Sequence, residues 1–329
     1  LDGKTEELTR RISNPSPGKL WNVEAKMMVY LNELTDRNVK ILLRTRAVDV
    51  TMRGRRIAGV TVITPDGLMY VPVECAVDAT GDGDLAALAG VPHLLGEQSG
   101  GNVQTFNMCE WKTHPALAGV NLDIDVIDAT DVFDTTRGIM LGHENGDAAS
   151  DFSPYPAVRE SRHIRGRYVL SVADVLSART FPDAIAVGST DYDQHGLQSS
   201  DFARMGYLPY HQDCKKVRIP YQACFADEAM NLLVTGKAFS AERDAFSFMR
   251  MQPDLQNMGY AVGLAAAQAV REKTDVSGID LRALQRKLLD KGNIAADDLL
   301  PPRDEDPESL IAEAGDAASF VRILCLPKA

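Results

Sequence analysis

The sequence predicts an α/β fold in which short parallel strands are covered by helices. Residues 232–234 (Leu-Leu-Val) form a short apolar run closed by Gly236, which is typical of a buried parallel strand. A second strand of this kind is expected at residues 76–79 and leads directly into a glycine turn. A long helix is expected from about Pro253, because proline suits a first helical turn and Asp254 complements the positive helix end.

This long helix is rich in glycine and alanine and has two interpretations. Its small residues would let a backbone or a flat ligand approach closely, and free N–H groups at its start would attract an anion. The spacing alone favours the simpler interpretation, in which these residues allow tight helix–sheet packing. The small residues are Gly259, Ala261, Gly263, Ala265, Ala266 and Ala267.

The composition is that of a globular protein with a core large enough for two joined domains. The chain has 329 residues, of which 45% are hydrophobic and 25% charged, and its formal net charge is −11. This charge argues against nucleic acid or an anionic membrane as a partner. The five cysteines are scattered without a C-x-x-C pair, so we expect free thiols and no metal site. With no signal peptide or membrane-spanning run, a cytoplasmic protein is expected.

The first part of the chain is expected to alternate helix and strand. Residues 22–37 show apolar side chains at helical spacing, and a buried strand is predicted at residues 39–43. Residues 47–74 predict a meander of three strands, since Arg53-Gly54-Arg55 and Pro65-Asp66-Gly67 are favourable turn sequences.

The glycine turn Gly81-Asp82-Gly83-Asp84-Leu85-Ala86 matches the G-x-G-x-x-A pattern of dinucleotide sites. We reject a simple pyrophosphate site here, because Asp82 and Asp84 would place two carboxylates where the phosphates should lie. No βαβ unit with an acidic residue at the end of its second strand follows at the expected distance. The alternative, an acidic first turn on a helix, explains both aspartates equally well.

Two polar clusters stand out in the less regular middle of the chain. Five arginine or histidine side chains between residues 159 and 167 indicate either an anion site or a surface strand paired with carboxylates. His195 stands beside Asp191 and Asp193, so that a carboxylate can orient its ring for general acid–base work. The competing interpretation is a polar loop without a catalytic role.

The remaining stretches have simpler interpretations. Residues 120–136 are acidic but lack the glycine and terminal glutamate of a calcium loop, so we expect a solvated face. A strand within residues 102–111 would line a second sheet. Residues 281–289 form an amphipathic helix, and residues 296–308 are acidic and proline-rich, as a linker is.

Four blocks of the sequence, taken in order, resemble the FAD-dependent oxidoreductases of the glutathione-reductase-like superfamily. Residues 77–86 (V-D-A-T-G-D-G-D-L-A) are similar to the second flavin motif of that family. Residues 159–166 resemble its arginine block, and residues 182–186 with His195 resemble the block after it. The carboxy-terminal flavin block comprises residues 219–222, residues 231–237, Ser240, Ala241, Arg250, Pro253, Met258, Gly259 and Gly263.

The resemblance implies a three-layer FAD/NAD(P)-binding (Rossmann-like) α/β domain, with FAD as cofactor and an inserted α+β substrate region. Residues 1–101 would be the first, partial stretch of the FAD domain, and residues 102–225 the substrate or cap region. Residues 226–292 would complete the FAD domain, and residues 293–329 would be a linker and tail.

The resemblance also implies the site residues. The helix at residues 257–263 would aim its start at the pyrimidine end of the flavin. Arg162, His195 and Arg250 would bind, orient or protonate the substrate. The implied cofactor-binding residues are Ala47 and Val48, which would contact adenine by backbone, and Ala79, Thr80, Gly81, Gly236, Asn257, Met258 and Gly259.

These roles predict hydride transfer between a small organic substrate and FAD, and two departures from the family pattern bear on that prediction. The sequence begins at Leu1, without the family's first strand, G-x-G-x-x-G turn and helix, so we expect an amino-terminally truncated domain that holds FAD weakly by itself. Residues 242–244 (Glu-Arg-Asp) stand where the family commonly has His-Glu-Ala. The alternatives are a non-catalytic remnant or interaction module that has lost flavin, and a separate chain that supplies the absent segment.

Overall fold

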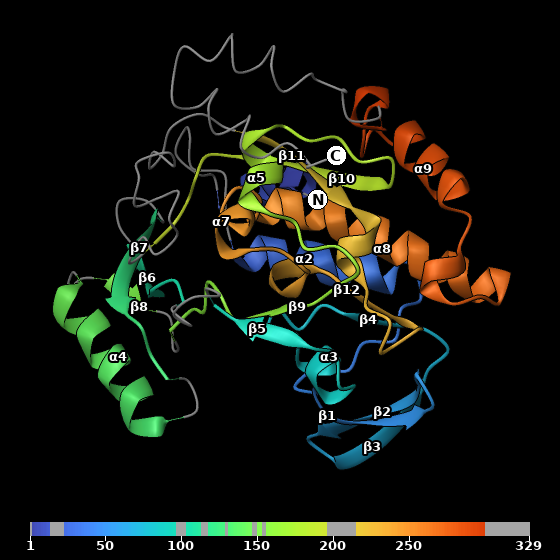
Figure 1. Cartoon of the computed structure of the whole chain (residues 1–329). Helices are drawn as coiled ribbons and strands as arrows, with labels where there is room; N and C mark the ends of the chain where they lie inside the picture. The colour runs from blue at the N-terminus through green and yellow to red at the C-terminus, as the bar shows by residue number, and fades with distance from the viewer. Residues whose placement is uncertain are drawn as a thin grey trace, which may run out of the picture. The chain divides into compact units, whose positions relative to one another are not determined.

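The computed structural model describes residues 2–13, 23–96, 103–112, 118–128, 131–146, 150–152, 156–195 and 215–299 (Figure 1). The chain falls into two compact units. Unit 1 combines residues 1–45 with 105–159, and unit 2 combines residues 46–104 with 160–329. The domain boundaries expected after residues 101, 225 and 292 stay a prediction.

In unit 1, two helices pack together and an antiparallel sheet has the strand order β7-β6-β8. The helices are α1 (Asp2–Ser13) and α2 (Val23–Thr35), and the strands are β6 (Phe106–Lys112), β7 (Ala118–Asp125) and β8 (Ser150–Phe152). Helix α2 confirms the helix predicted at residues 22–37, and β6 confirms the strand expected within residues 102–111. In the acidic stretch after β6, Asp123 pairs with Arg159 and Asp134 pairs with Arg137.

Helix α4 (Val132–Asn145) lies against β6 and β7, and glycine makes this contact possible. A Cβ on Gly142 would stand 2.5 Å from Cγ of the buried Met108. The helix begins at a conventional N-cap, since the Asp131 carboxylate accepts a hydrogen bond from the N–H of Phe133 at 2.8 Å.

The buried strand predicted at residues 39–43 is wrong. This segment has no strand structure, and the side chains of Val39, Leu42 and Leu43 are 46%, 51% and 71% exposed. An apolar run becomes a strand only where a neighbour takes up its N–H and C=O groups, and no strand of the described residues does so. One face of α2 is open in the same way, at Met27, Met28, Leu31 and Leu34.

Unit 2 contains the two strands on which the α/β prediction rests. β4 (Ala76–Asp78) and β12 (Leu232–Val234) pair in parallel, with Leu232 beside Ala76 and Val234 beside Asp78. The long helix α8 (Gln252–Glu272), orange in Figure 1, packs against both strands and against β10 (Ala184–Thr190). The two strands and the start of the helix near Pro253 therefore agree with the prediction.

The meander predicted at residues 47–74 is confirmed as an antiparallel sheet in the order β1-β2-β3. Its strands are β1 (Arg46–Arg53), β2 (Arg56–Thr64) and β3 (Gly67–Pro72). The Asn231 amide ties this sheet to the parallel pair, because it bonds the N–H and C=O of Ile57 and the C=O of Glu74 at 2.8 to 2.9 Å. Asn231 immediately precedes β12, so its side chain links the two sheets directly.

Two further antiparallel pairs lie in the described part of unit 2. β10 pairs with β11 (Lys215–Pro220), and β5 (His93–Leu95) pairs with β9 (Arg162–Ile164). The other helical segments of this unit are α3 (Asp84–Leu88), α5 (Val172–Leu176), α7 (Arg243–Phe246), α9 (Leu281–Asp290) and the short turns η1 (Tyr221–Cys224), η2 (Gly236–Ala238), η3 (Val276–Gly278) and η4 (Ala296–Leu299). Buried side chains such as Ile185, Leu233, Phe246 and Met258 form its core. Among the described helices, none is long and apolar enough to cross a membrane.

Candidate functional site

The glycine turn after β4 is built around the buried carboxylate of Asp78. Asp78 Oδ1 accepts hydrogen bonds from the N–H and the hydroxyl of Thr80 at 3.0 and 2.7 Å, and Oδ2 accepts one from the N–H of Ala86 at 2.8 Å. Thr80 Oγ1 in turn accepts from the N–H of Asp84 at 3.0 Å. Thr80 is a predicted cofactor-binding residue, and its hydroxyl both donates and accepts inside the turn and so shapes it.

The turn leaves three consecutive main-chain N–H groups, those of Gly81, Asp82 and Gly83, without an acceptor in the part of the chain that the structure describes. Gly81 and Gly83 have φ angles of +83° and +66°, which glycine adopts without the strain of a side chain. Successive N–H groups in a backbone of this kind form a concavity that binds acceptor oxygens.

Cationic side chains surround the two carboxylates of the turn. Arg162 Nη1 lies 2.9 Å from Asp84 Oδ1 and also donates to the carbonyl of Asp82 at 3.0 Å. Lys237 Nζ lies 3.3 Å from Asp82 Oδ1, and Arg46 Nη2 lies 3.5 Å from Asp84 Oδ2. Opposite charges at these distances reduce the repulsion that the aspartates would exert on an anion. The pairs are partly exposed, so each adds little to stability.

Several residues predicted to bind the cofactor meet at this turn. Ala47 and Val48 lie in β1, which packs against α3 and whose first residue reaches Asp84. A β-bulge leaves Val48 out of the ladder and 40% exposed. Gly236, with φ +78°, opens η2 immediately before the lysine that contacts Asp82, and a Cβ on it would meet open space. Ala79 lies between Asp78 and the turn.

The predicted residues in α8 lie beyond its first turn. The helix begins at Gln252, and the N–H of Leu255 already donates to the carbonyl of Met251 at 3.0 Å, so Asn257, Met258 and Gly259 lie further along it. The helix start near Pro253 is as expected, and the contact of residues 257–259 with the flavin stays a prediction.

The small residues of α8 face two different surroundings. Ala261 and Ala265 are completely buried, whereas a Cβ on Gly259 or Gly263 would meet nothing within 4 Å. The tight helix–sheet packing that the spacing favours therefore does not explain these two glycines.

A second group of predicted site residues is brought together by Asp193. His195 Nε2 lies 3.0 Å from Asp193 Oδ1, and Arg250 Nη2 lies 2.8 Å from Asp193 Oδ2. Arg250 also donates through Nε and Nη2 to the Asp193 carbonyl at 3.1 and 2.9 Å. The carboxylate contact expected for His195 is thus confirmed. A histidine held in this way can accept or donate a proton.

Arg162 does not join this group, because its hydrogen bonds go to the glycine turn. The other members of the arginine block are also largely paired: Arg159 lies 2.6 Å from Asp123, and Arg167 lies 2.6 Å from Asp227. Of the two interpretations of this block, pairing with carboxylates agrees with these contacts.

A buried polar network adjoins His195. The main-chain N–H of Gln104 donates to Glu160 Oε2 at 2.8 Å. The side-chain oxygen of Gln104 accepts from the N–H of His195 at 3.3 Å. Glu160 is 1% exposed and also lies 3.2 Å from Arg243 Nε and 3.4 Å from His163 Nε2. Nothing in the local sequence marks Gln104, because its partners lie far along the chain.

Asp78 is also absent from the predicted site, although a signal for it exists. An aspartate at a strand end, two residues before a threonine, is the pattern of an Asx turn. Here that turn is what presents the N–H groups of the glycine loop.

Burial changes the acidity of two further groups in unit 2. It raises the pKa of Tyr192, which also donates its hydroxyl to Asp244 at 2.7 Å, so the phenol stays protonated. Burial likewise raises the pKa of Asp254 in the first turn of α8, and Oδ2 of this carboxylate has no hydrogen-bond partner among the described residues.

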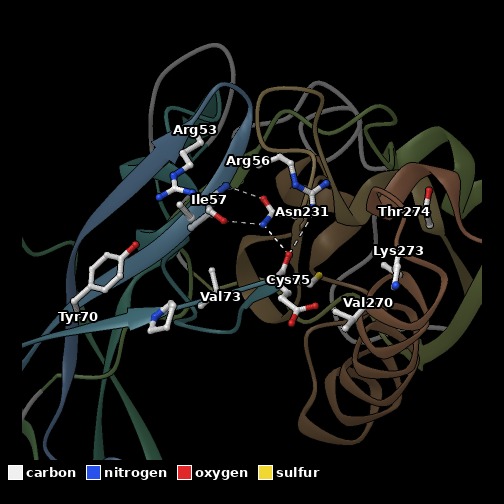
Figure 2. A pocket seen from close by; sticks show the side chains of 14 residues that line it. Arg53, Arg56, Ile57, Tyr70, Val73, Cys75, Asn231, Val270, Lys273 and Thr274 are labelled. Atoms are coloured by element: carbon white, nitrogen blue, oxygen red, sulfur yellow. Dashed lines mark hydrogen bonds between the residues drawn. The ribbon is translucent and has the colours of Figure 1, made fainter.

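A cavity of about 620 Å³ lies between the β1–β3 sheet and the last turn of α8 (Figure 2). Figure 2 shows Arg53 and Tyr70 on the side of the sheet, Lys273 on the side of the helix, and Asn231 and Cys75 between them. Burial raises the pKa of the Cys75 thiol to about 11, which makes it unreactive at neutral pH. None of the predicted site residues lines this cavity.

Comparison with known protein families agrees with the resemblance in the sequence. The model of the family described as FAD dependent oxidoreductase matches residues 2–136 and 124–288. Among curated proteins, no sequence matches this chain. The matched segments cover most of the chain, so the fold is of the FAD/NAD(P)-binding class and the cofactor is FAD. This chain therefore belongs to the FAD dependent oxidoreductase family.

Proposed function

We propose that the protein is an oxidoreductase that moves a hydride between a small organic substrate and FAD. The observation that carries the proposal is the group of His195, Asp193 and Arg250, which lies in the same compact unit as the glycine turn. Oxidation of a C–H bond beside an O–H or N–H group releases a proton as well as a hydride, and this group supplies a proton acceptor.

The residues of the glycine turn fit one part of FAD. The free N–H groups of Gly81, Asp82 and Gly83 suit acceptor oxygens, while the carboxylates of Asp82 and Asp84 suit hydroxyl donors and disfavour phosphates. We therefore assign this turn, with Ala47, Val48 and Gly236, to the adenosine half of the cofactor. When bound, FAD accepts or donates the hydride.

The cluster around Asp193 would handle the substrate. His195 would take up the proton that the substrate releases, and the Asp193 carboxylate would stabilise the resulting imidazolium. The Arg250 side chain is 12% exposed, and its contacts with Asp193 hold the guanidinium in one orientation. In that orientation it would bind and orient a polar group of the substrate. Arg162, which bonds to the glycine turn, would serve the cofactor end of the site.

The test is reduction of the FAD-loaded protein by a panel of small hydroxy and amino compounds, followed by loss of the flavin's visible absorbance. We expect at least one compound to reduce the flavin. His195→Gln should slow that reduction by roughly 10²–10⁴-fold, because a positioned general base contributes that much. Bound FAD, measured by its absorbance per protein, should stay the same in this variant.

Arg250→Lys is expected to lower the rate as well, since lysine cannot reproduce the planar contacts with the carboxylate and carbonyl of Asp193. Arg162→Lys should weaken FAD binding instead, because the side chain of Arg162 donates to Asp82 and Asp84 of the glycine turn. Rates unchanged in both His195→Gln and Arg250→Lys would overturn the assignment of the substrate site.

A further inference from the structure

We infer that Gln104 is a positioning residue for His195: it ties the loop that carries the histidine to the buried Glu160–Arg243 pair and so maintains the contact between His195 and Asp193. The value of that contact for catalysis rests on the proposed function. Gln104 itself is 0% exposed, and its hydrogen bonds run to three separate parts of the chain.

The bonds of Gln104 fix one orientation of its amide. Its side-chain oxygen accepts from the N–H of His195 at 3.3 Å, and Nε2 donates to Ser247 Oγ at 3.1 Å. Its main-chain N–H donates to Glu160 Oε2 at 2.8 Å. A buried amide bonded at both its oxygen and its nitrogen cannot turn without leaving a polar group unsatisfied.

The segment 193–195 is held at both ends by the same region. At one end, the N–H of Asp193 donates to the carbonyl of Ser247 at 3.2 Å, and Arg250 holds the Asp193 carbonyl. At the other end, Gln104 links the N–H of His195 to Ser247 Oγ, which donates to the Arg243 carbonyl at 3.0 Å. Loss of the Gln104 amide would remove this link at the His195 end and leave the bonds of Asp193 to Ser247 and Arg250 in place, so the imidazole would spend less time beside the carboxylate.

A neutral amide suits this position because it adds no charge to a crowded buried site. Glu160 already has Arg243 and His163 as partners, with side chains 3% and 4% exposed. Among the described residues, the titratable and charged groups around the histidine loop and its supports include Asp191, Tyr192, Asp193, Glu160, His163, Arg243, Asp244 and Arg250.

The experiment is NMR titration of the six histidines in the FAD-loaded protein, with the His195 signals identified from their loss in His195→Asn. A carboxylate beside an imidazole favours the charged ring, so Asp193→Asn should lower the pH at which His195 titrates. Gln104→Met keeps the side-chain shape and removes the amide, and it should also lower the pH at which His195 titrates. Gln104→Glu keeps the acceptor for the His195 N–H and should not lower it.

Gln285→Met is the matched control. Gln285 is 2% exposed, and its amide donates to the carbonyls of Pro182 and Ala184 at 2.9 and 3.2 Å. Both methionine variants should lose comparable stability, because each leaves buried carbonyl or hydroxyl groups unsatisfied. Only Gln104→Met should shift the titration of His195.

The inference would be overturned if His195 titrated at the same pH in Gln104→Met as in the wild type. It would also be overturned if Gln285→Met shifted this pH as much as Gln104→Met does. If Gln104→Met does not fold, a lower titration pH of His195 in Gln104→Glu than in the wild type would overturn the inference. The titration needs no substrate, so its outcome is separate from that of the flavin-reduction test. A normal reduction rate in His195→Gln would remove the catalytic role of the histidine and leave the positioning contact standing.

Discussion

Asp254 shows, at the scale of one residue, how burial can outweigh a favourable helix end. Its carboxylate lies in the first turn of α8, where the partial positive charge of the helix stabilises an anion. Burial nevertheless raises its pKa, and the N–H of Ser189 at 3.4 Å offsets this only in part. The folded state therefore disfavours the charged form of this carboxylate relative to the unfolded chain.

Asp254→Asn is accordingly expected to stabilise the protein at pH 7. A raised pKa in the folded state means that Asp254 supports folding when protonated, and that this support is lost as the pH rises above its unfolded value of about 3.9. Asparagine stays neutral, so the gain should be present at pH 7 and should shrink toward pH 4. Urea unfolding at both pH values measures it, with the exposed Asp66→Asn as control. A lower stability of Asp254→Asn at pH 7 would contradict the burial argument.

At the scale of elements, two helices use glycine for opposite reasons. α4 approaches β6 so closely that a Cβ on Gly142 would meet the stem of Met108 at 2.5 and 2.8 Å. On α8, a Cβ on Gly263 would meet nothing within 4 Å. Gly142 is needed because a larger residue would not fit against Met108. Gly263 has no such neighbour and brings only the entropic cost of glycine in a helix.

Alanine at these two positions should therefore have opposite effects. Gly142→Ala is expected to destabilise the protein by about 1–3 kcal/mol through overpacking. Gly263→Ala should stabilise it by roughly 0.5–1 kcal/mol, because alanine restricts the unfolded chain and fits the open side of α8. Denaturant unfolding of the two single variants gives both numbers. A loss of stability in Gly263→Ala would mean that this side of α8 is covered.

At the scale of the whole molecule, the cofactor end of the site depends on segments that are far apart in sequence. Arg46 of β1 and Arg162 of β9 both pair with Asp84, and Lys237 of η2 pairs with the neighbouring Asp82. The parallel pairing of β4 with β12 holds η2 beside the turn, since the N–H of Thr235 donates to the carbonyl of Asp78 at 2.9 Å. Asp78 is therefore the residue on which both the turn and this junction rest.

Asp78→Asn should weaken both the fold and FAD binding. Asparagine can still accept from Thr80, but its NH₂ group would then face the N–H of Ala86, which leaves a buried donor unsatisfied at a cost of about 1–3 kcal/mol. If the same distortion reaches the free N–H groups of Gly81 and Gly83, FAD affinity falls by roughly tenfold for each 1.4 kcal/mol lost. Urea unfolding and FAD titration measure the two effects. A destabilised variant with unchanged FAD affinity would show that the turn lies outside the cofactor site.

The sequence by itself determined the elements whose signals are local. The apolar runs at residues 76–79 and 232–234, the turns of the meander and the start of α8 near Pro253 all follow from short-range patterns, and the structure contains them. The resemblance to flavin-dependent enzymes rests on local motifs in the same way, and the family match agrees with it. His195 beside an aspartate is likewise visible in a few residues of sequence.

Only the tertiary structure decided which of these residues meet. Residues 39–43 have the apolar pattern of a strand, but a strand needs a neighbour for its backbone groups, and none of the described residues supplies one. Arg162 and Arg250 look alike in sequence, yet the first bonds to the glycine turn and the second to Asp193. Nothing in the local sequence marks Gln104. Its role arises from hydrogen bonds made in a folded interior, where a buried polar group must find a partner whatever its distance along the chain.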